Sequence, residues 1–233
     1  MSNRTTYALG AVALVLIAGI VVLALKWGRD GVAIRNDGYG PVRDPGVHSV
    51  LAPDGTITLG KADAAKTIDV YEDPICPGCG SMERTYGQEI AQKIDEGKLA
   101  VRYHLVNFLD PKSGSKNYST RAIAANECVA EAGSGPVYSK FHELLFTSKQ
   151  PKEGGGDLSN DELGAIAREA GATEPVIQCV TAGTKVAAAK INAKTAMDAL
   201  TAKLGDKAAT PAVYDGDTKI DVNDSEWVVS LTK

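Results

Sequence analysis

The stretch TIDVYEDPICPGCGSMERTYGQEI, residues 67–90, holds two of the four cysteines in the chain, Cys76 and Cys79. The β-prone run at 67–71 predicts a buried strand, and the residues from Cys76 onward have the length and composition of a helix. A second β-prone run, LAVRYHLV, follows at 99–106. These segments predict a β-α-β unit with parallel strands and a right-handed crossover. The cysteine pair then stands between the first strand and the helix.

Two cysteines with this spacing can be metal ligands, a structural disulfide or a redox pair. Zinc sites of four cysteines usually consist of two close pairs, but the other cysteines, Cys128 and Cys179, are isolated. A purely structural bond between Cys76 and Cys79 closes too short a loop to restrict the unfolded chain much. At a helix N-terminus, backbone N–H groups and the helix dipole favour a thiolate. The position therefore favours a redox pair with Cys76 as the reactive thiol, and we expect neither a metal nor a cofactor.

The sequence gives no sign of nucleic-acid or nucleotide binding, and it predicts a membrane-spanning segment near the N-terminus. A formal net charge of −4 gives no sign of a nucleic-acid surface, and no Walker-type or dinucleotide-binding glycine loop occurs. The uncharged run YALGAVALVLIAGIVVLAL at 7–25 would span roughly 28 Å as a helix, close to the thickness of a bilayer core. We expect residues 1–25 to be a single-pass membrane anchor, with a cleaved signal peptide or a buried core helix as the alternatives. Residues 26–47 are rich in turn formers and predict a linker.

The remaining residues, 48–233, are interpreted as one domain. The segment SVLAPDGTITL at 49–59 predicts a β-hairpin. Apolar residues at helical spacing predict several helices within about 112–183 and then a long helix that ends at Gly205. The segment TPAVYDGDTKIDV at 210–222 predicts a strand-turn-strand before a short final helix. The predicted order is β-α-β, a helical insertion, a long helix and β-β-α.

From about residue 66 onward the chain resembles DsbA-like thioredoxin-fold disulfide oxidoreductases, particularly the membrane-anchored actinobacterial kind. The residues that carry the resemblance are DVYEDPICPGC at 69–79, the insertion with its own cysteine pair, and ATPAVY at 209–214. The resemblance implies an α/β (α+β) thioredoxin fold with a helical insertion, preceded by a single N-terminal transmembrane helix. It also implies that Pro211 is cis and packs beside the active-site sulfurs. An ordinary trans proline opening an edge strand is the alternative.

The resemblance further implies a shallow apolar groove that holds an extended peptide of the substrate. We expect Ile75, Pro77 and Gly78 to border this groove beside Pro211. The backbone near Thr210 would add strand-like hydrogen bonds to the peptide.

The chain also departs from the family in its ionisable residues. Family members often carry a buried acid six residues before the first cysteine, where this chain has Val70; among the nearby acids, Asp73 is the better substitute. The three histidines, His48, His104 and His142, are distant from the cysteine pair in sequence. We interpret them as surface or packing residues.

The second cysteine pair, Cys128 and Cys179, is expected to form a structural disulfide between two helices of the insertion. Such a bond would close a loop of about 50 residues and contribute about 4 kcal/mol in the chain-entropy model. Because this second cysteine pair follows a predicted export anchor, we expect the domain to lie in an oxidising compartment. The alternative is that both are unlinked small core residues.

Together these features predict an extracytoplasmic thiol–disulfide oxidoreductase that forms disulfides in exported cysteine-containing proteins through Cys76 and Cys79. By resemblance, a membrane reoxidase, either DsbB or a vitamin K epoxide reductase homologue, would restore the enzyme disulfide. A reductase or isomerase on the same fold is an alternative, because no residue pattern decides the direction of electron flow. A non-catalytic anchored peptide-binding module with a permanently closed pair is another.

Overall fold

The computed structural model describes residues 33–233, of which Ile34–Lys233 forms one unit. The predicted anchor at 1–25 and the first part of the predicted linker lie outside the described residues. Within 33–233, no helix combines the length and the apolar character that a membrane crossing requires.

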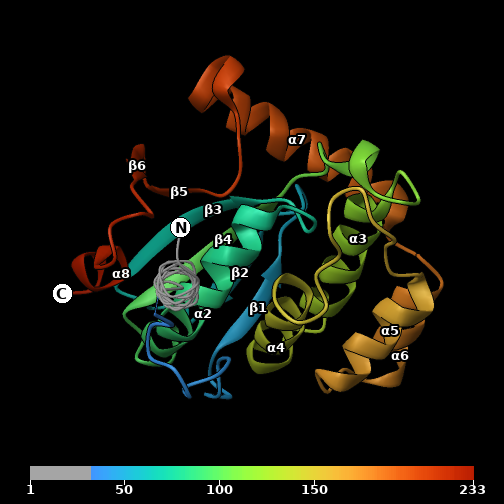
Figure 1. Ribbon diagram of the computed structural model, residues 1–233. Helices are drawn as coiled ribbons and strands as arrows, with labels where there is room; N and C mark the ends of the chain where they lie inside the picture. Colours follow the sequence, from blue (N-terminus) through green and yellow to red (C-terminus); the bar gives the residue numbers. More distant parts are fainter. Residues whose placement is uncertain (1–32) are drawn as a thin grey trace, which may run out of the picture. The chain divides into compact units, whose positions relative to one another are not determined.

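A mixed sheet of six strands lies at the centre of this unit (Figure 1), in the order β1-β2-β4-β3-β5-β6. The strands are β1 (His48–Leu51), β2 (Ile57–Gly60), β3 (Lys66–Glu72), β4 (Leu99–Leu105), β5 (Ala212–Asp215) and β6 (Thr218–Ile220). β3 and β4 run parallel, and the other neighbouring strands run antiparallel. Helix α2 (Pro77–Asp95) joins the parallel strands, so the predicted β-α-β unit is confirmed.

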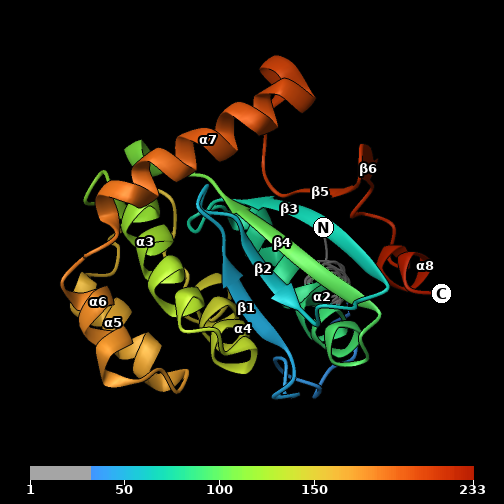
Figure 2. The ribbon, with the colours of Figure 1, turned by 180° about the vertical axis from the view of Figure 1, so that it is seen from behind.

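The other helices follow the predicted order, with an insertion between β4 and the long helix α7. They are η1 (Asp110–Lys112), α3 (Tyr118–Glu131), α4 (Gly135–Phe146), α5 (Asn160–Glu169), α6 (Glu174–Thr181), α7 (Val186–Leu204), η2 (Gly205–Lys207) and α8 (Trp227–Leu231). Helices α3 to α6 lie together at one side of the sheet in both views (Figures 1 and 2). This arrangement is a thioredoxin fold with a helical insertion.

Alternating residues of β3 face opposite sides of the sheet, as in any strand. Val70 belongs to the main core, which also contains both redox cysteines and the buried faces of α2, α3 and α4. Tyr71 instead packs with Leu200 of α7 and with Tyr214 of β5 in a smaller cluster. The redox pair is therefore built into the main core, where α2 meets the C-terminal end of β3.

A disulfide fastens the helical insertion. Cys128 of α3 is bonded to Cys179 of α6, 51 residues further along the chain. The alternative of two unlinked core residues is therefore wrong.

The predicted linker at 26–47 requires a correction, because residues 34–47 are bound to α2. Arg35 pairs with Glu89 at 3.2 Å, and the Tyr39 hydroxyl donates a hydrogen bond of 2.7 Å to Asp95. The backbone N–H of Arg43 donates to the same Asp95 carboxylate at 3.0 Å. The side chains and backbone N–H groups of this turn-rich segment donate hydrogen bonds to carboxylates of α2, so the segment is held in place. We call residues 34–47 the N-terminal strap.

Candidate redox site

Helix α2 begins directly at the cysteine pair. Cys76 is the N-cap residue, with an extended backbone (φ −66°, ψ 118°), and its Sγ accepts a hydrogen bond of 3.4 Å from the backbone N–H of Cys79. Pro77 occupies the first turn, where its missing N–H costs nothing. The local sequence therefore places the Cys76 sulfur where the unpaired N–H groups of the helix point.

The surroundings of Cys76 favour its thiolate. A hydrogen bond from the Cys79 thiol, with others from the backbone N–H groups of Cys79 and Gly78, outweighs burial and lowers the pKa of Cys76 to about 6. The Thr210 hydroxyl is buried and has no hydrogen-bond partner in the described part of the chain. In its thiol form Cys76 donates to the Thr210 carbonyl oxygen at 3.4 Å.

Cys79 has the opposite character. It is 0% exposed, against 6% for Cys76. Burial raises the pKa of the Cys79 thiol well above its ordinary value, and the charge of Glu72 raises it further. Both cysteines are unbonded thiols in this structure. Cys76 is therefore suited to be the nucleophile and Cys79 the shielded, slower thiol.

The predicted substrate groove is only partly built from the expected residues. Pro77 and Gly78 are exposed, Thr210 is half-buried, and the Thr210–Pro211 peptide bond is cis. A Cβ at Gly78 would lie 3.1 Å from Pro211 Cδ and 3.7 Å from Cys76 Sγ, which places this proline beside the pair.

Ile75 does not line the groove as predicted, because its side chain is 0% exposed and belongs to the main core. The physical reason is the turn before the cysteines. The Asp73 side chain accepts a hydrogen bond of 3.1 Å from the Ile75 backbone N–H, and this local turn is compatible with a side chain directed inward.

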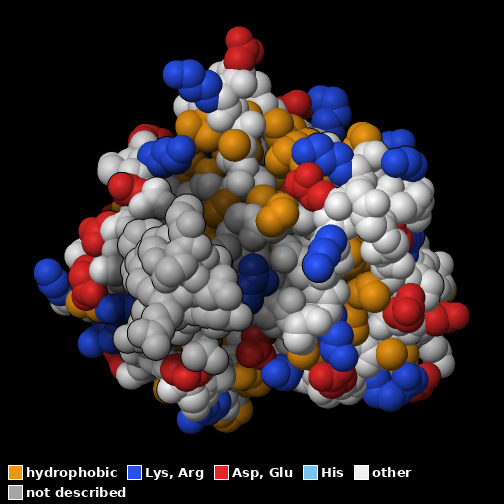
Figure 3. Space-filling model, in the orientation of Figure 1, with side chains coloured by type: hydrophobic (Ala, Val, Ile, Leu, Met, Phe, Trp, Pro, Cys, Tyr) orange, Lys and Arg blue, Asp and Glu red, His pale blue; other side chains and the backbone are white. Residues whose placement is uncertain are grey.

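Beside the cis proline the surface is hollowed. A cavity of about 390 Å³ is lined by Pro211 and residues 219–223. Hydrophobic side chains gather on the face of Figure 3 over and beneath α7, with Lys and Arg side chains around them. The surface beside Pro211 is therefore hollowed.

Two buried acids lie just before the pair, and they have different surroundings. Asp73 accepts hydrogen bonds from Ser119 Oγ at 2.6 Å and from the Leu109 backbone N–H at 3.0 Å. Burial raises the pKa of Asp73 to about 7. Glu72 is 0% exposed, and it is the acid whose charge acts on Cys79. Glu72 is therefore a second buried acid beside the pair, and the choice of Asp73 as the substitute acid stays a prediction.

All three histidines are surface or packing residues, as interpreted from the sequence. His48 is exposed, and His104 packs against the Tyr71 ring with centroids 4.5 Å apart. His142 is buried, and its Nε2 lies 2.6 Å from a carboxylate oxygen of Glu72. Sequence distance hid this contact, since Glu72 and His142 are 70 residues apart.

Gln150 is a further residue that the sequence did not single out. Its side-chain amide donates hydrogen bonds to the backbone carbonyls of Pro74 at 3.2 Å and Cys76 at 2.9 Å. The loop after α4 thereby holds the turn that carries the redox pair. Within residues 33–233, no cluster of three or more His, Cys, Asp or Glu side chains suited to a metal ion was found.

A protein-family model described as thioredoxin matches residues 53–231. The chain belongs to this family. Its cysteine pair stands between a strand and a helix of the thioredoxin fold.

Solved structures with the same fold include known redox proteins. The MdbA protein of Corynebacterium diphtheriae, a thiol-disulfide oxidoreductase, aligns with a TM-score of 0.70 at 24% identity, over 82% of this chain and 96% of that one. At this identity the match shows the fold alone. DsbA of Mycobacterium tuberculosis aligns with a TM-score of 0.60 at 28% identity, over 76% of this chain and 98% of that one.

A curated relative from Mycobacterium tuberculosis has a different overall description, the serine/threonine-protein kinase PknE. It is 39% identical over 177 residues, which are 75% of this chain. The match spans only 31% of PknE, so it concerns one part of that longer protein.

Proposed function

We propose that this protein oxidises pairs of cysteine thiols in exported proteins and thereby forms their disulfide bonds. The observation that carries the proposal is the environment of Cys76, whose hydrogen bonds lower its pKa to about 6. An environment that stabilises the Cys76 thiolate stabilises the reduced form of the pair. A pair with a stabilised reduced form is a strong oxidant.

The chemistry follows from the different surroundings of the two cysteines. A substrate thiolate attacks Cys76 Sγ, the Cys76–Cys79 bond breaks, and its electron pair stays on the Cys79 sulfur, which takes up a proton. A second substrate thiolate then attacks the substrate sulfur of the mixed disulfide. Cys76 leaves as the thiolate that the start of α2 stabilises. The substrate has lost two electrons, and the enzyme pair has gained them.

The compartment and the partners form the second part of the proposal. The Cys128–Cys179 disulfide supports an oxidising environment, because such bonds are rare in the cytosol. We place the domain on the extracytoplasmic side of the cell membrane, held there by residues 1–25 as a single-pass anchor. A quinone-linked membrane reoxidase of the DsbB or vitamin K epoxide reductase type would take the two electrons from the reduced pair.

A redox titration against glutathione tests the direction of electron flow. We expect a reduction potential more oxidising than about −200 mV, together with oxidation of a reduced, unfolded test protein in stoichiometric amounts. The Cys76→Ser variant is the matched control and should be inactive. A potential near that of thioredoxin, about −270 mV, would instead support a reductase. Protection of both thiols from alkylation after mild reduction would support a non-catalytic binding module.

A further inference from the structure

The loop after α4 directs a side chain back towards the redox pair. Gln150 is half-buried, whereas Lys149 and Lys152 on either side of it are exposed. The loop backbone is tied to the end of α4, because the N–H of Lys149 donates a hydrogen bond of 2.9 Å to the Leu144 carbonyl. Pro151 follows directly and restricts the backbone of Gln150. The Gln150 side chain therefore extends from a fixed point.

The Gln150 carboxamide contacts the backbone on both sides of the reactive cysteine. Its Nε2 donates hydrogen bonds to the carbonyl oxygens of Pro74 at 3.2 Å and of Cys76 at 2.9 Å. An amide group has two hydrogens, so each carbonyl can receive one. The Cys76 carbonyl also accepts a hydrogen bond of 3.1 Å from the Gly80 N–H, within the first turn of α2. The two carbonyls enclose Ile75 and Cys76, so these bonds fix the backbone that carries the reactive sulfur.

The place of the Cys76 sulfur depends on this backbone. At φ −66° and ψ 118° the residue is extended, and its Sγ accepts a hydrogen bond of 3.4 Å from the Cys79 N–H. A rotation of the Cys76 peptide would turn the sulfur away from the N–H groups at the start of α2. Those N–H groups favour the thiolate, so a sulfur that left them would be a poorer leaving group.

A glycine in α2 makes room for the Gln150 carboxamide. Gly80 follows Cys79 directly and is buried inside the helix, where glycine is less favourable than alanine. A Cβ at Gly80 would overlap the carboxamide, at 2.8 Å from its Cδ, and would lie 2.7 Å from the Phe146 carbonyl oxygen. The close approach of the loop therefore explains why a glycine stands here.

We propose that Gln150 is a positioning residue of the redox site, which holds the Cys76 sulfur at the start of α2, and that Gly80 admits it. Cys76 leaves the mixed disulfide as a thiolate, and its sulfur must then lie beside the N–H groups of the helix. A loop of the insertion thereby adjusts the reactivity of a cysteine that follows β3. The inference rests on the thiol–disulfide exchange proposed above.

The titratable groups that face Cys76 come from its own helix and from the end of β3. They are Cys79, Glu72 and Asp73. The hydrogen bonds of the Cys76 sulfur outweigh its burial and lower its pKa to about 6. Removing the uncharged carboxamide of Gln150 changes no charge among these groups. A shift in the pH profile of Cys76 after that removal therefore reports a change in the position of the sulfur.

The test measures the alkylation rate of Cys76 against pH in reduced protein, by mass spectrometry of the labelled peptide. Gln150→Met keeps the length of the side chain but has no donor. In this variant we expect the half-maximal rate to move upward by roughly 0.5–1 pH unit, with a rate at pH 6 that is about two- to fivefold lower. The reduction potential against glutathione should become less oxidising by up to about 30 mV, the equivalent of a tenfold change in the equilibrium constant. A destabilisation shared by the oxidised and reduced forms moves neither quantity.

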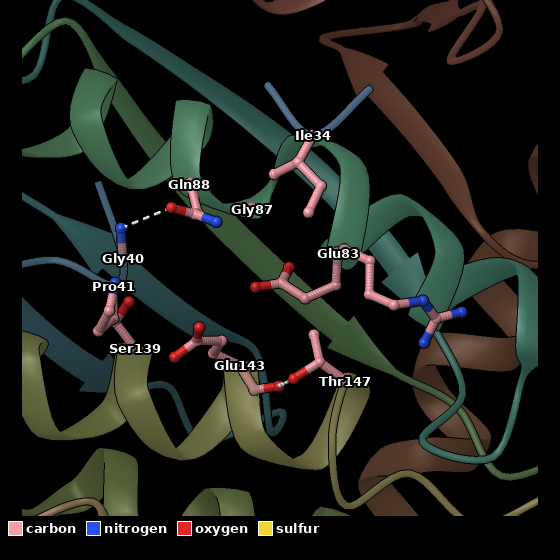
Figure 4. A pocket seen from close by; sticks show the side chains of 10 residues that line it. Ile34, Gly40, Pro41, Glu83, Gly87, Gln88, Ser139, Glu143 and Thr147 are labelled. Atoms are coloured by element: carbon pink, nitrogen blue, oxygen red, sulfur yellow. Dashed lines mark hydrogen bonds between the residues drawn. The ribbon is translucent and has the colours of Figure 1, made fainter. Parts of the chain in front are cut away.

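A matched control and a second route to the same defect separate positioning from general damage. Gln88 is also half-buried and also binds the backbone of a distant segment, since it accepts a hydrogen bond of 2.8 Å from the Gly40 N–H (Figure 4). Gln88→Met should leave the Cys76 profile and the potential unchanged. Gly80→Ala should displace the Gln150 carboxamide and reproduce the shift of Gln150→Met. Adding Gly80→Ala to Gln150→Ala should shift the profile little further, because no carboxamide remains to be displaced.

The proposal is overturned if folded Gln150→Met keeps the Cys76 profile and the potential of the unmodified protein, or if Gln88→Met shifts them equally. It is also overturned if the shifts of Gly80→Ala and Gln150→Ala add. Gln150→Ala replaces Gln150→Met in the test if the methionine variant does not fold. Alkylation requires no physiological substrate. A reducing potential in the unmodified protein, with a shifted profile in Gln150→Met, would therefore remove the proposed oxidase function and leave the positioning role standing.

Discussion

The side-chain amide of Gln150 donates a hydrogen bond of 2.9 Å to the backbone carbonyl of Cys76, a residue 74 positions earlier in the chain. The same amide reaches the carbonyl of Pro74, so one side chain holds both ends of the turn that presents the reactive sulfur. The same Cys76 carbonyl also accepts a hydrogen bond from the backbone N–H of Gly80 in α2. The insertion is therefore connected directly to the start of the redox helix.

Replacing Gln150 by alanine should loosen this turn. The Gln150→Ala variant loses two hydrogen bonds, and we expect the free energy of unfolding to fall by about 1–2 kcal/mol. Amide hydrogen exchange at Gly80 should become faster. The matched control is Lys149→Ala, which removes a neighbouring side chain paired only with Glu169 at the surface. Identical exchange rates in both variants would contradict the role of Gln150.

The two redox thiols should react with alkylating agents at very different rates. Because the thiolate is the reactive form and the pKa of Cys76 is lowered to about 6, its alkylation rate should be half-maximal near pH 6 and nearly constant above pH 7. Cys79 should remain almost unlabelled over the same range, since burial raises its pKa. Mass spectrometry of the labelled peptides distinguishes the two sites. Preferential labelling of Cys79 would reverse the assignment of roles.

The lowered pKa of Cys76 also makes the stability of the reduced protein depend on pH. The folded-state pKa of Cys76 is lower than its ordinary value of 9.0, so the folded state holds the proton less tightly than the unfolded state does. The contribution of Cys76 to the stability of the reduced protein is therefore fully present above about pH 9. It is lost as the pH falls towards 6. Urea unfolding of reduced protein against a Cys76→Ser control should show a difference that shrinks with decreasing pH in this window.

The Cys128–Cys179 disulfide should affect stability far more than activity. Replacing both cysteines by alanine removes a cross-link between residues 51 positions apart, which contributes about 4 kcal/mol in the chain-entropy model. We expect the melting temperature to fall by roughly 10 °C. Thiol oxidation at low temperature should persist, because both residues lie outside the redox site. A folded variant without activity would contradict a purely structural role.

The N-terminal strap should depend on the ion pair between Arg35 and Glu89. The Glu89 side chain is only 3% exposed, so Arg35→Ala leaves a buried carboxylate without its partner. We expect a loss of roughly 2–3 kcal/mol of unfolding free energy. Adding Glu89→Gln removes the stranded charge and should restore part of the loss. If the double variant is less stable than Arg35→Ala, the energetic argument for this pair fails.

Local patterns in the sequence determined the elements and the chemistry of the pair. The spacing of Cys76 and Cys79 after a β-prone run, with Pro77 opening the helix, predicted both the β-α-β unit and the position of the sulfur at a helix N-terminus. These features depend on residues a few positions apart, whose periodicity and capping preferences act locally. In the same way, the capping box of Ser159 and Glu162, three residues apart, begins α5 by local contacts alone.

The surroundings of the pair were decided by tertiary structure. Glu72 meets His142 only because α4 packs against the end of β3, and Gln150 reaches Cys76 only because the loop after α4 returns to α2. A signal for His142 was present, since it lies at helical spacing from Tyr138 and Phe146 on the buried face of α4. The periodicity indicated burial, but it could not name a partner 70 residues away. Long-range packing decides that Glu72 pairs with His142, that Gln150 holds the turn and that Ile75 turns inward. Local sequence preferences do not encode that packing residue by residue.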